Sequence, residues 1–296
     1  MKPVKSFNET INHSYNITQR HAEWAEYREK VTAFISSTNL DNKDVLIVGA
    51  GNLNDINLNQ FRKVSKSISL LDVDTKAVTT GLKRQKLDPA EYTLLELDLT
   101  GLDQEYEIDS KNVKSANSFF DAFTDALNHG TLKSFVEDYE NHQLSYNLPK
   151  YDVIVILPIY TQILLHQLMN QAHQTLGRVD QQTAQMIMEL SGGLLSKINN
   201  ELLGCLAKQG IIVALSDVLE YSQDSAEYTK LSTIIADRVQ ATAFYETYLD
   251  RYGYSLGAYG LYDLASKCEV ELEQFMLWNF DINRRMLVKC IKGMVM

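Results

Sequence analysis

The sequence predicts an α/β protein built on a doubly wound sheet, with helices on both faces. Short apolar segments alternate with amphipathic ones along most of the 296 residues. The segments 151–160 and 210–217 are nearly free of polar residues, as is typical of strands covered on both sides. The final apolar stretch, 272–293, has the pattern of two strands joined at 281–283, so an antiparallel hairpin is expected to end the chain.

The first forty residues are expected to form a helical cap ahead of the sheet. Apolar side chains recur there at steps of three and four, which is the helical period, at Trp24, Val31, Phe34 and Ile35. The first strand, 44–49, follows and runs into Gly49-Ala50-Gly51. A helix is expected after this glycine turn, with Ile56, Leu58 and Phe61 on its apolar face.

The remaining elements follow in alternation. Strands are expected at 67–74 and 92–99, with a helix at 75–85 between them. The connection 103–149 is long and is expected to carry a helical insertion, whose helix from Phe119 ends near Gly130. Further helices are expected at 164–176, at 181–208 with a break near Gly192-Gly193, and at 226–250. The chain thus divides into a helical cap, 1–40, and one α/β domain, 41–296, which contains the insertion.

Composition and charge exclude several classes of protein. The net charge of −10 disfavours a general nucleic-acid binder, because phosphate binding needs a basic surface. No apolar run approaches the length of about 18 residues that a membrane helix needs, and the N-terminus lacks the apolar core of a signal peptide. The three cysteines are odd in number and far apart, which predicts reduced core thiols rather than a metal site. We therefore expect a cytoplasmic protein with no nucleic-acid partner, no membrane contact and no bound metal.

The glycine turn and two acids indicate a nucleotide site. A Gly-x-Gly turn after a buried strand allows close approach of backbone to a ligand. Asp72 ends the second strand, 21 residues after Gly51, where a carboxylate can accept from both ribose hydroxyls. Asp74 is better placed to cap the next helix. NAD binding is disfavoured because Asn54 replaces the third glycine of the dinucleotide fingerprint, and because a second acid, Asp98, can accept from an adenine amino group.

These segments resemble the class I S-adenosylmethionine-dependent methyltransferases. The similarity rests on "DVLIVGAGNLNDINL", "LLDVDTKAV", "LELDLTGL", "YDVIVILPIY", "GIIVALSD" and the closing hairpin, in that order. It implies a Rossmann-like sheet of seven strands, mostly parallel with an antiparallel last strand, and S-adenosyl-L-methionine as cofactor. The implied cofactor-binding residues are Gly49, Ala50, Gly51, Asn52, Asp72, Val73, Asp98, Leu99 and Pro158.

The chain departs from the family pattern at the methionine end of the site. Ile47 stands where many members have an acid, and Leu53 where many have a third glycine. Asn52, Asn54 and Asp55 are candidates for supplying the missing polar contacts.

The candidate catalytic residues lie at the ends of strands or in the cap, because these parts of the chain would meet beside the cofactor. Tyr160, at the end of the fourth strand, would contact the cofactor or a substrate, or pack at the sheet edge. Asp217, at the end of the fifth, would act as a base, bind a substrate amine, or be a solvated loop acid. His13, Tyr15 and Arg20 of the cap would reach over the cofactor or lie on a surface helix. Trp278 is expected in the core of the hairpin rather than in a substrate site.

Three functions are compatible with this pattern. The leading one is methylation of a small or medium-sized acceptor. The triplet Asp72-Val73-Asp74 resembles one found in spermidine synthases, so transfer of an aminopropyl or aminocarboxypropyl group, as in spermidine and nicotianamine synthases, is an alternative. The third is a non-catalytic protein that binds the cofactor without turnover.

Overall fold

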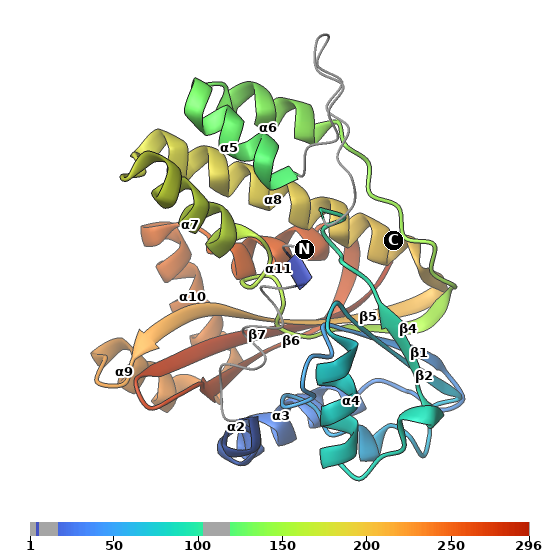
Figure 1. The fold of residues 1–296 in the computed structure, drawn as a ribbon. Coiled ribbons are helices and arrows are strands. Elements are labelled where there is room, and N and C mark those ends of the chain that lie inside the picture. Colours follow the sequence, from blue (N-terminus) through green and yellow to red (C-terminus); the bar gives the residue numbers. More distant parts are fainter. Residues whose placement is uncertain (1–3, 6–16, 103–118, 296) are drawn as a thin grey trace.

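A single seven-stranded sheet organises the chain, in the order β3-β2-β1-β4-β5-β7-β6 (Figure 1). The computed structural model describes residues 4–5, 17–102 and 119–295. Strands β1 to β5 are parallel, whereas β7 is antiparallel to both β5 and β6. The strands are β1 (Asp44–Val48), β2 (Ser67–Asp72), β3 (Thr93–Glu96), β4 (Tyr151–Ile156), β5 (Leu206–Ser222), β6 (Cys268–Asn279) and β7 (Arg284–Val295). This is the expected fold class, with the antiparallel hairpin at the end of the chain.

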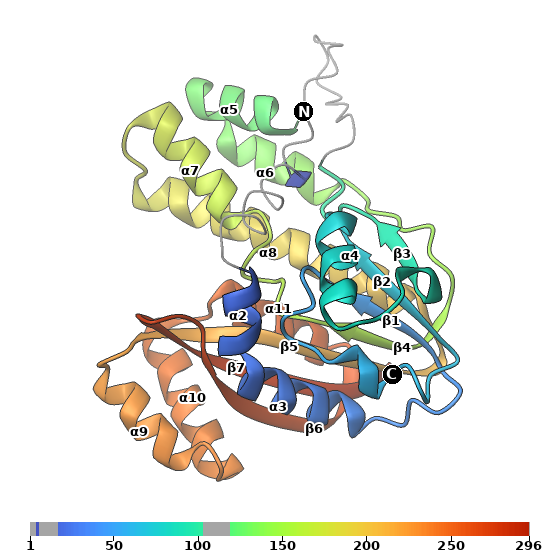
Figure 2. The same ribbon diagram turned by 60° about the horizontal axis from the view of Figure 1, so that its bottom comes forward.

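Helices cover both faces of the sheet, so the winding is double (Figure 2). Helices α3 and α4 lie on one face, and α8 and α11 lie on the other with α5, α6 and α7 stacked outside them. The helices are α2 (Ile17–Glu23), α3 (Ala25–Ser36), α4 (Thr75–Arg84), α5 (Phe119–His129), α6 (Leu132–Glu140), α7 (Leu165–Leu176), α8 (Gln181–Gly204), α9 (Ala226–Ile234), α10 (Arg238–Tyr252) and α11 (Leu256–Ala265).

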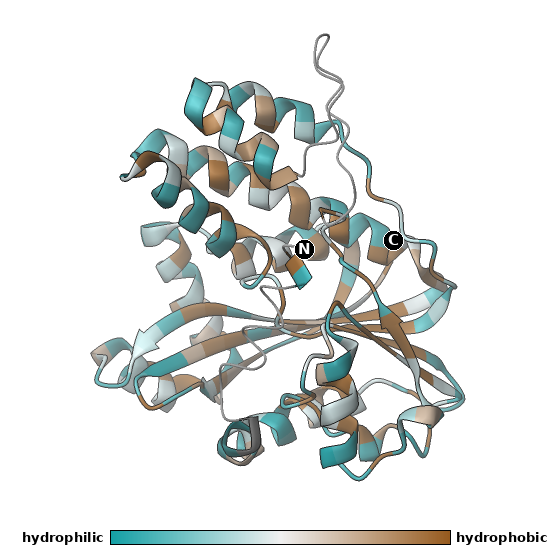
Figure 3. Ribbon diagram, viewed as in Figure 1, coloured by the Kyte–Doolittle hydropathy of each residue, from teal (hydrophilic) through white to brown (hydrophobic). Residues whose placement is uncertain are grey.

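The strand residues explain why both faces must be covered. Side chains alternate between the faces of a strand, and in β1 all of the last four residues are apolar and buried. Leu46 and Val48 pack into the core beneath α5 to α8 and α11, whereas Val45 and Ile47 pack into the core beneath α3 and α4. The apolar colouring of the central strands in Figure 3 reflects this double burial.

The N-terminal helices share a core with the sheet. Val31, Phe34 and Ile35 of α3 are buried in the same apolar cluster as the strand residues on that face. Tyr27 stacks on Trp278 of β6 with ring centroids 4.5 Å apart, and Trp24 meets the same ring edge-on at 4.6 Å. The apolar stripe of the first forty residues is therefore buried against the last strands of the chain.

Several elements differ from the sequence expectation. After the glycine turn the chain forms only a 3-10 turn, η1 (Leu58–Gln60), which Asn57 caps. The side chain of Gln85 accepts from the amide of Leu58 and donates to the carbonyl of Ile56, so it takes backbone groups that a longer helix would pair internally. Helix α8 runs unbroken through Gly192, where a Cβ would lie 3.2 Å from the ring of Tyr259 on α11. The absent side chain thus serves close packing of two helices, not a break.

Element lengths also differ at the C-terminal half. Strand β5 continues to Ser222, beyond the expected end at 217, because it pairs with β7 along its whole second half. The expected helix 226–250 is two helices, α9 and α10, and α11 was not expected. In the insertion, α5 ends before Gly130 as predicted, and a second helix, α6, follows it.

The structure also shows the state of the three cysteines and the lengths of the helices. Cys205, Cys268 and Cys290 are buried free thiols, as predicted. Among the residues that the structure describes, no helix has the length and apolar character required to cross a bilayer.

Asp74 is predicted to stabilise the fold by capping α4. Its buried carboxylate accepts from the amide of Ala77 at 3.1 Å. We expect Asp74→Ala to lower the free energy of unfolding by about 1 kcal/mol in urea denaturation. Asp88→Ala is the matched control, since Asp88 caps only the three-residue turn η2 (Pro89–Glu91), and it should change stability by less. An equal loss in both variants would contradict the assigned cap.

Candidate functional site

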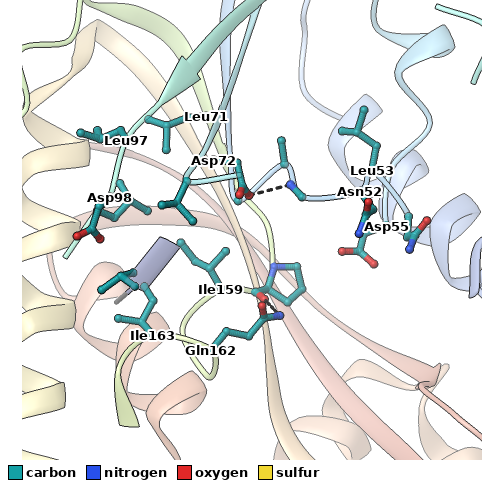
Figure 4. Close-up of a pocket in the computed structure, with 18 of the residues that line it drawn as sticks. Asn52, Leu53, Asp55, Leu71, Asp72, Leu97, Asp98, Ile159, Gln162 and Ile163 are labelled. Atoms are coloured by element: carbon teal, nitrogen blue, oxygen red, sulfur yellow. Dashed lines mark hydrogen bonds between the residues drawn. The ribbon is translucent and has the colours of Figure 1, made fainter. Parts of the chain in front are cut away.

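One pocket opens at the carboxyl ends of the parallel strands, around the end of β1. All nine residues expected to bind the cofactor line it, from Gly49 at the first strand to Pro158 after the fourth. Figure 4 shows Asp72 in the middle of the view, with Asp98 to one side and Asp55 to the other. In an open α/β sheet, this edge is where ligands bind, at the point where the strand order reverses. Here β1 is that point, since β2 and β4 flank it.

The glycine turn needs both of its glycines. Gly49 has φ +74° and Gly51 has φ +45°, in the left-handed region that favours glycine. A Cβ on Gly49 would lie 2.1 Å from Cγ2 of Ile159, so the segment after β4 passes directly over the turn. The turn and this segment together form the floor of the pocket.

Asp72 links the glycine turn to the end of β2. Its Oδ2 accepts from the amide of Gly51 at 2.8 Å, and its Oδ1 accepts from the amide of Asp74 at 2.9 Å. Burial raises the pKa of this carboxyl to about 6, although the two amides act to lower it. Each oxygen has a second lone pair, so the carboxylate can still accept from a ligand hydroxyl.

Asp98 lies in the turn that follows β3. Its Oδ1 accepts from the amide of Thr100 at 2.9 Å and from the Thr100 hydroxyl at 2.6 Å. This local contact fixes the turn, and Asp98 and Leu99 both line the pocket. Asp98 therefore has a structural role in the turn as well as a position in the candidate site.

Two arginines hold the loop after the glycine turn. Arg84 of α4 donates to the side-chain oxygen of Asn54 and to the carbonyl of Asn52, and Arg28 of α3 donates to the carbonyl of Asn54. Leu53, between Asn52 and Asn54, is buried and has a φ of +53°. A leucine thus adopts the left-handed backbone conformation at the position where many members of the methyltransferase family that the sequence resembles have glycine.

A second strained residue lines the same pocket. Leu164, just before α7, has φ +62° and is buried. Such conformations cost about 1–3 kcal/mol each and gather at functional sites. Two of them at one pocket support its assignment as the functional site.

Of the candidate catalytic residues that the structure describes, neither Tyr160 nor Asp217 lines the pocket. Tyr160 is fully buried away from it, and its hydroxyl donates to Oδ1 of Asn199 on α8 at 2.7 Å. Burial raises its pKa well above the ordinary value. The structure therefore places Tyr160 as a packing residue. Tyr15 and His13 lie outside the described residues, whereas Arg20 lines the pocket.

Asp217, in β5, is half-buried and does not line the pocket. The Thr161 hydroxyl lies 2.9 Å from both carboxylate oxygens of Asp217. Burial raises the pKa of Asp217 to about 6. Burial and then the charge of Asp217 raise the pKa of Asp55 to about 7, and Arg28 opposes this. Asp55 lines the pocket, and its Oδ1 is buried with no hydrogen-bond partner among the described residues.

Aromatic residues at one end of the pocket were missed as site residues. Trp24, Trp278 and Phe280 line it, and the Arg20 guanidinium lies over the rings of Trp24 and Phe280. Trp24 Nε1 donates to the carbonyl of Phe280 at 2.9 Å. Trp278 is a core residue, as expected, but it also forms part of the pocket wall.

Comparison with known proteins gives matches among solved structures. No protein-family model matches the chain, and neither does any curated protein sequence. Magnesium protoporphyrin IX methyltransferase from Synechocystis PCC 6803, with bound SAH, is 9% identical with a TM-score of 0.44, over 95% of this chain and 89% of that one. A SAM-dependent methyltransferase from Methanosarcina mazei is 9% identical with a TM-score of 0.43, over 89% and 97%.

A third match has a similar level of likeness. The N-methyltransferase NodS from Bradyrhizobium japonicum WM9, in complex with S-adenosylhomocysteine, is 12% identical with a TM-score of 0.38, over 93% of this chain and 86% of that one. The sheet topology described above, rather than these likenesses, is the observation on which the fold assignment rests.

Three half-buried acids predict how stability depends on pH. The pKa values of Asp55, Asp72 and Asp217 in the folded protein are about 7, 6 and 6, above the ordinary value of 3.8. Between pH 4 and 7 the unfolded chain therefore binds fewer protons than the folded one. Their contribution to stability is complete below pH 4 and is lost as the pH rises through 6 to 7.

Asp55→Asn tests this dependence, because asparagine stays neutral at every pH. Urea denaturation of the protein without cofactor, at pH 5 and pH 7.5, should show a smaller fall in the free energy of unfolding for the variant. We expect the difference between the two proteins to be about 2 kcal/mol or more. Asp41→Asn, at an exposed position, is the control and should leave the fall unchanged. Parallel pH curves for wild type and Asp55→Asn would exclude the raised pKa.

Proposed function

We propose that the protein is an S-adenosyl-L-methionine-dependent methyltransferase that acts on a small or medium-sized acceptor. The observation that carries the proposal is the convergence of all nine expected cofactor residues on one pocket, at the reversal point of a sheet with the methyltransferase strand order. Asp72, ending β2, would accept from the ribose hydroxyls, and the segment Asp98-Leu99 would lie beside the adenine. The glycine turn would hold the methionine part.

The cofactor would supply a methyl group on a positively charged sulfur, and the protein's part is mainly alignment. In-line displacement requires an approach of about 3–3.5 Å between the acceptor atom and the methyl carbon. Pro158 and Ile159 follow β4 and pass over the glycine turn, so they would position the reactive end. The apolar side chains of Ile159, Ile163 and Leu164 would exclude water from that part of the pocket.

The spermidine-synthase alternative rested on the triplet 72–74. In the structure Asp72 and Val73 line the pocket, whereas Asp74 is buried at the start of α4 and caps that helix. The third member of the triplet therefore has a structural role here. Detection of methylthioadenosine as a product, in place of S-adenosylhomocysteine, would nevertheless favour this alternative over methyl transfer.

Calorimetry with S-adenosylhomocysteine and with NAD tests the proposed cofactor. We expect S-adenosylhomocysteine to bind and NAD not to bind. Asp72→Ala should weaken binding by about 2–3 kcal/mol, because a charged acceptor for two hydroxyls is removed. Asp74→Ala is the matched control, as a neighbouring acid that does not line the pocket, and should weaken binding much less. Tight NAD binding without S-adenosylhomocysteine binding would overturn the proposal.

A further inference from the structure

The aromatic end of the pocket is a separate chemical environment from the nucleotide end. The expected cofactor residues belong to β1, β2, β3 and the end of β4. Trp24, Trp278 and Phe280 instead come from the N-terminal helices and the β6–β7 hairpin. Along the sheet edge, β5, β7 and β6 lie beyond β4 from the cofactor strands. This end of the pocket is therefore on the side where an acceptor would meet the methyl group.

Buried polar atoms at this end lack protein partners. Trp278 is 3% exposed, lines the pocket, and has an Nε1 with no hydrogen-bond partner among the described residues. Oδ1 of Asp55, which also lines the pocket, lacks a partner too, as does the hydroxyl of Tyr27, which stacks on Trp278 but does not itself line the pocket. Leaving such atoms unpaired is energetically costly, so a group of them indicates a ligand.

The charge at this end selects the kind of ligand. The charge of Asp217 on β5 acts to raise the pKa of Asp55, so the two carboxylates repel each other, and a cation placed against Asp55 would relieve that repulsion. Aromatic faces such as those of Trp278 and Trp24 attract organic cations. A protonated amine can donate to Asp55 Oδ1, and a hydroxyl or carboxylate on the same molecule would accept from Trp278 Nε1.

We propose that Asp55, supported by Asp217 and walled by Trp24 and Trp278, binds a protonated amine of the acceptor substrate. The proposal rests on the proposed function only in assigning the amine to the acceptor. It deepens that function by naming the substrate class. Asp217 then acts through Asp55, as a positioning residue, and does not itself contact the substrate amine.

Binding should depend on pH in a defined direction. The charged and titratable groups that interact electrostatically with Asp55 are Asp217 of β5 and, from α3, Tyr27 and Arg28. Its pKa of about 7 means that it is largely neutral at pH 6 and largely ionised at pH 8. Because an ammonium group binds the ionised form more strongly, amine affinity should rise over this interval.

The test uses phenethylamine and its neutral counterpart 2-phenylethanol, titrated by calorimetry into the full-length protein saturated with S-adenosylhomocysteine. At pH 7.5, wild type should bind the amine at least tenfold more tightly than the alcohol. Asp55→Asn should lose about tenfold in amine affinity and keep its affinity for the alcohol. Asp41→Asn, an exposed acid, is the control and should bind as wild type does. Urea denaturation of each variant checks that it is folded.

Two results would overturn the proposal. One is equal amine affinity in wild type and Asp55→Asn. The other is an Asp55→Asn protein that loses affinity for S-adenosylhomocysteine but not for the amine, which would assign the acid to the amine of the cofactor. Failure of wild type to bind S-adenosylhomocysteine would instead count against the proposed function. The amine titration on the protein without cofactor would then still decide whether Asp55 binds an amine.

Discussion

The carboxylate of Asp72 is the contact on which the site depends. It joins the end of β2 to the turn after β1, by accepting from the amides of Gly51 and Asp74. Both amides favour the ionised form, whereas burial raises the pKa to about 6, so the carboxylate is held at an energetic cost that the fold must offset. In return, the glycine turn is fixed in its left-handed conformation beside the segment that follows β4. The pocket exists because these strand ends are held together.

The part of the pocket that is proposed to hold the nucleotide could be predicted from the sequence, because its geometry is set by the parallel sheet. Carboxyl ends of adjacent parallel strands meet at one edge, so Asp72 and Asp98 had to lie near the turn at Gly49 once the strands were identified. The cap at Asp74 followed from the helix pattern. The prediction of a helix after the turn was wrong, because apolar spacing alone does not reveal that the side chain of Gln85 binds the loop backbone.

The aromatic end could not be predicted, because it depends on contacts between distant parts of the chain. Trp24 and Phe280 are 256 residues apart and meet only because α3 packs against β6. Tyr160 shows the same limit. Its position at a strand end left both a site role and packing open. In the structure Gly260 on α11 leaves room for its ring, and Asn199 accepts from its hydroxyl. Whether a strand-end side chain points into the pocket or into a helix layer is decided by that layer. The electrostatic effect of Asp217 on Asp55 likewise joins distant parts of the chain, β5 and the loop after β1.

A crystal structure of the protein with S-adenosylhomocysteine tests the central claim most directly. The account predicts the ribose hydroxyls within hydrogen-bond distance of Asp72 and the adenine beside Asp98 and Leu99. It also predicts that the sulfur lies near Pro158 and Ile159 and that the space between Trp24 and Trp278 stays open for an acceptor. A ligand bound away from the glycine turn, or one that fills the aromatic end with its adenine, would contradict the account.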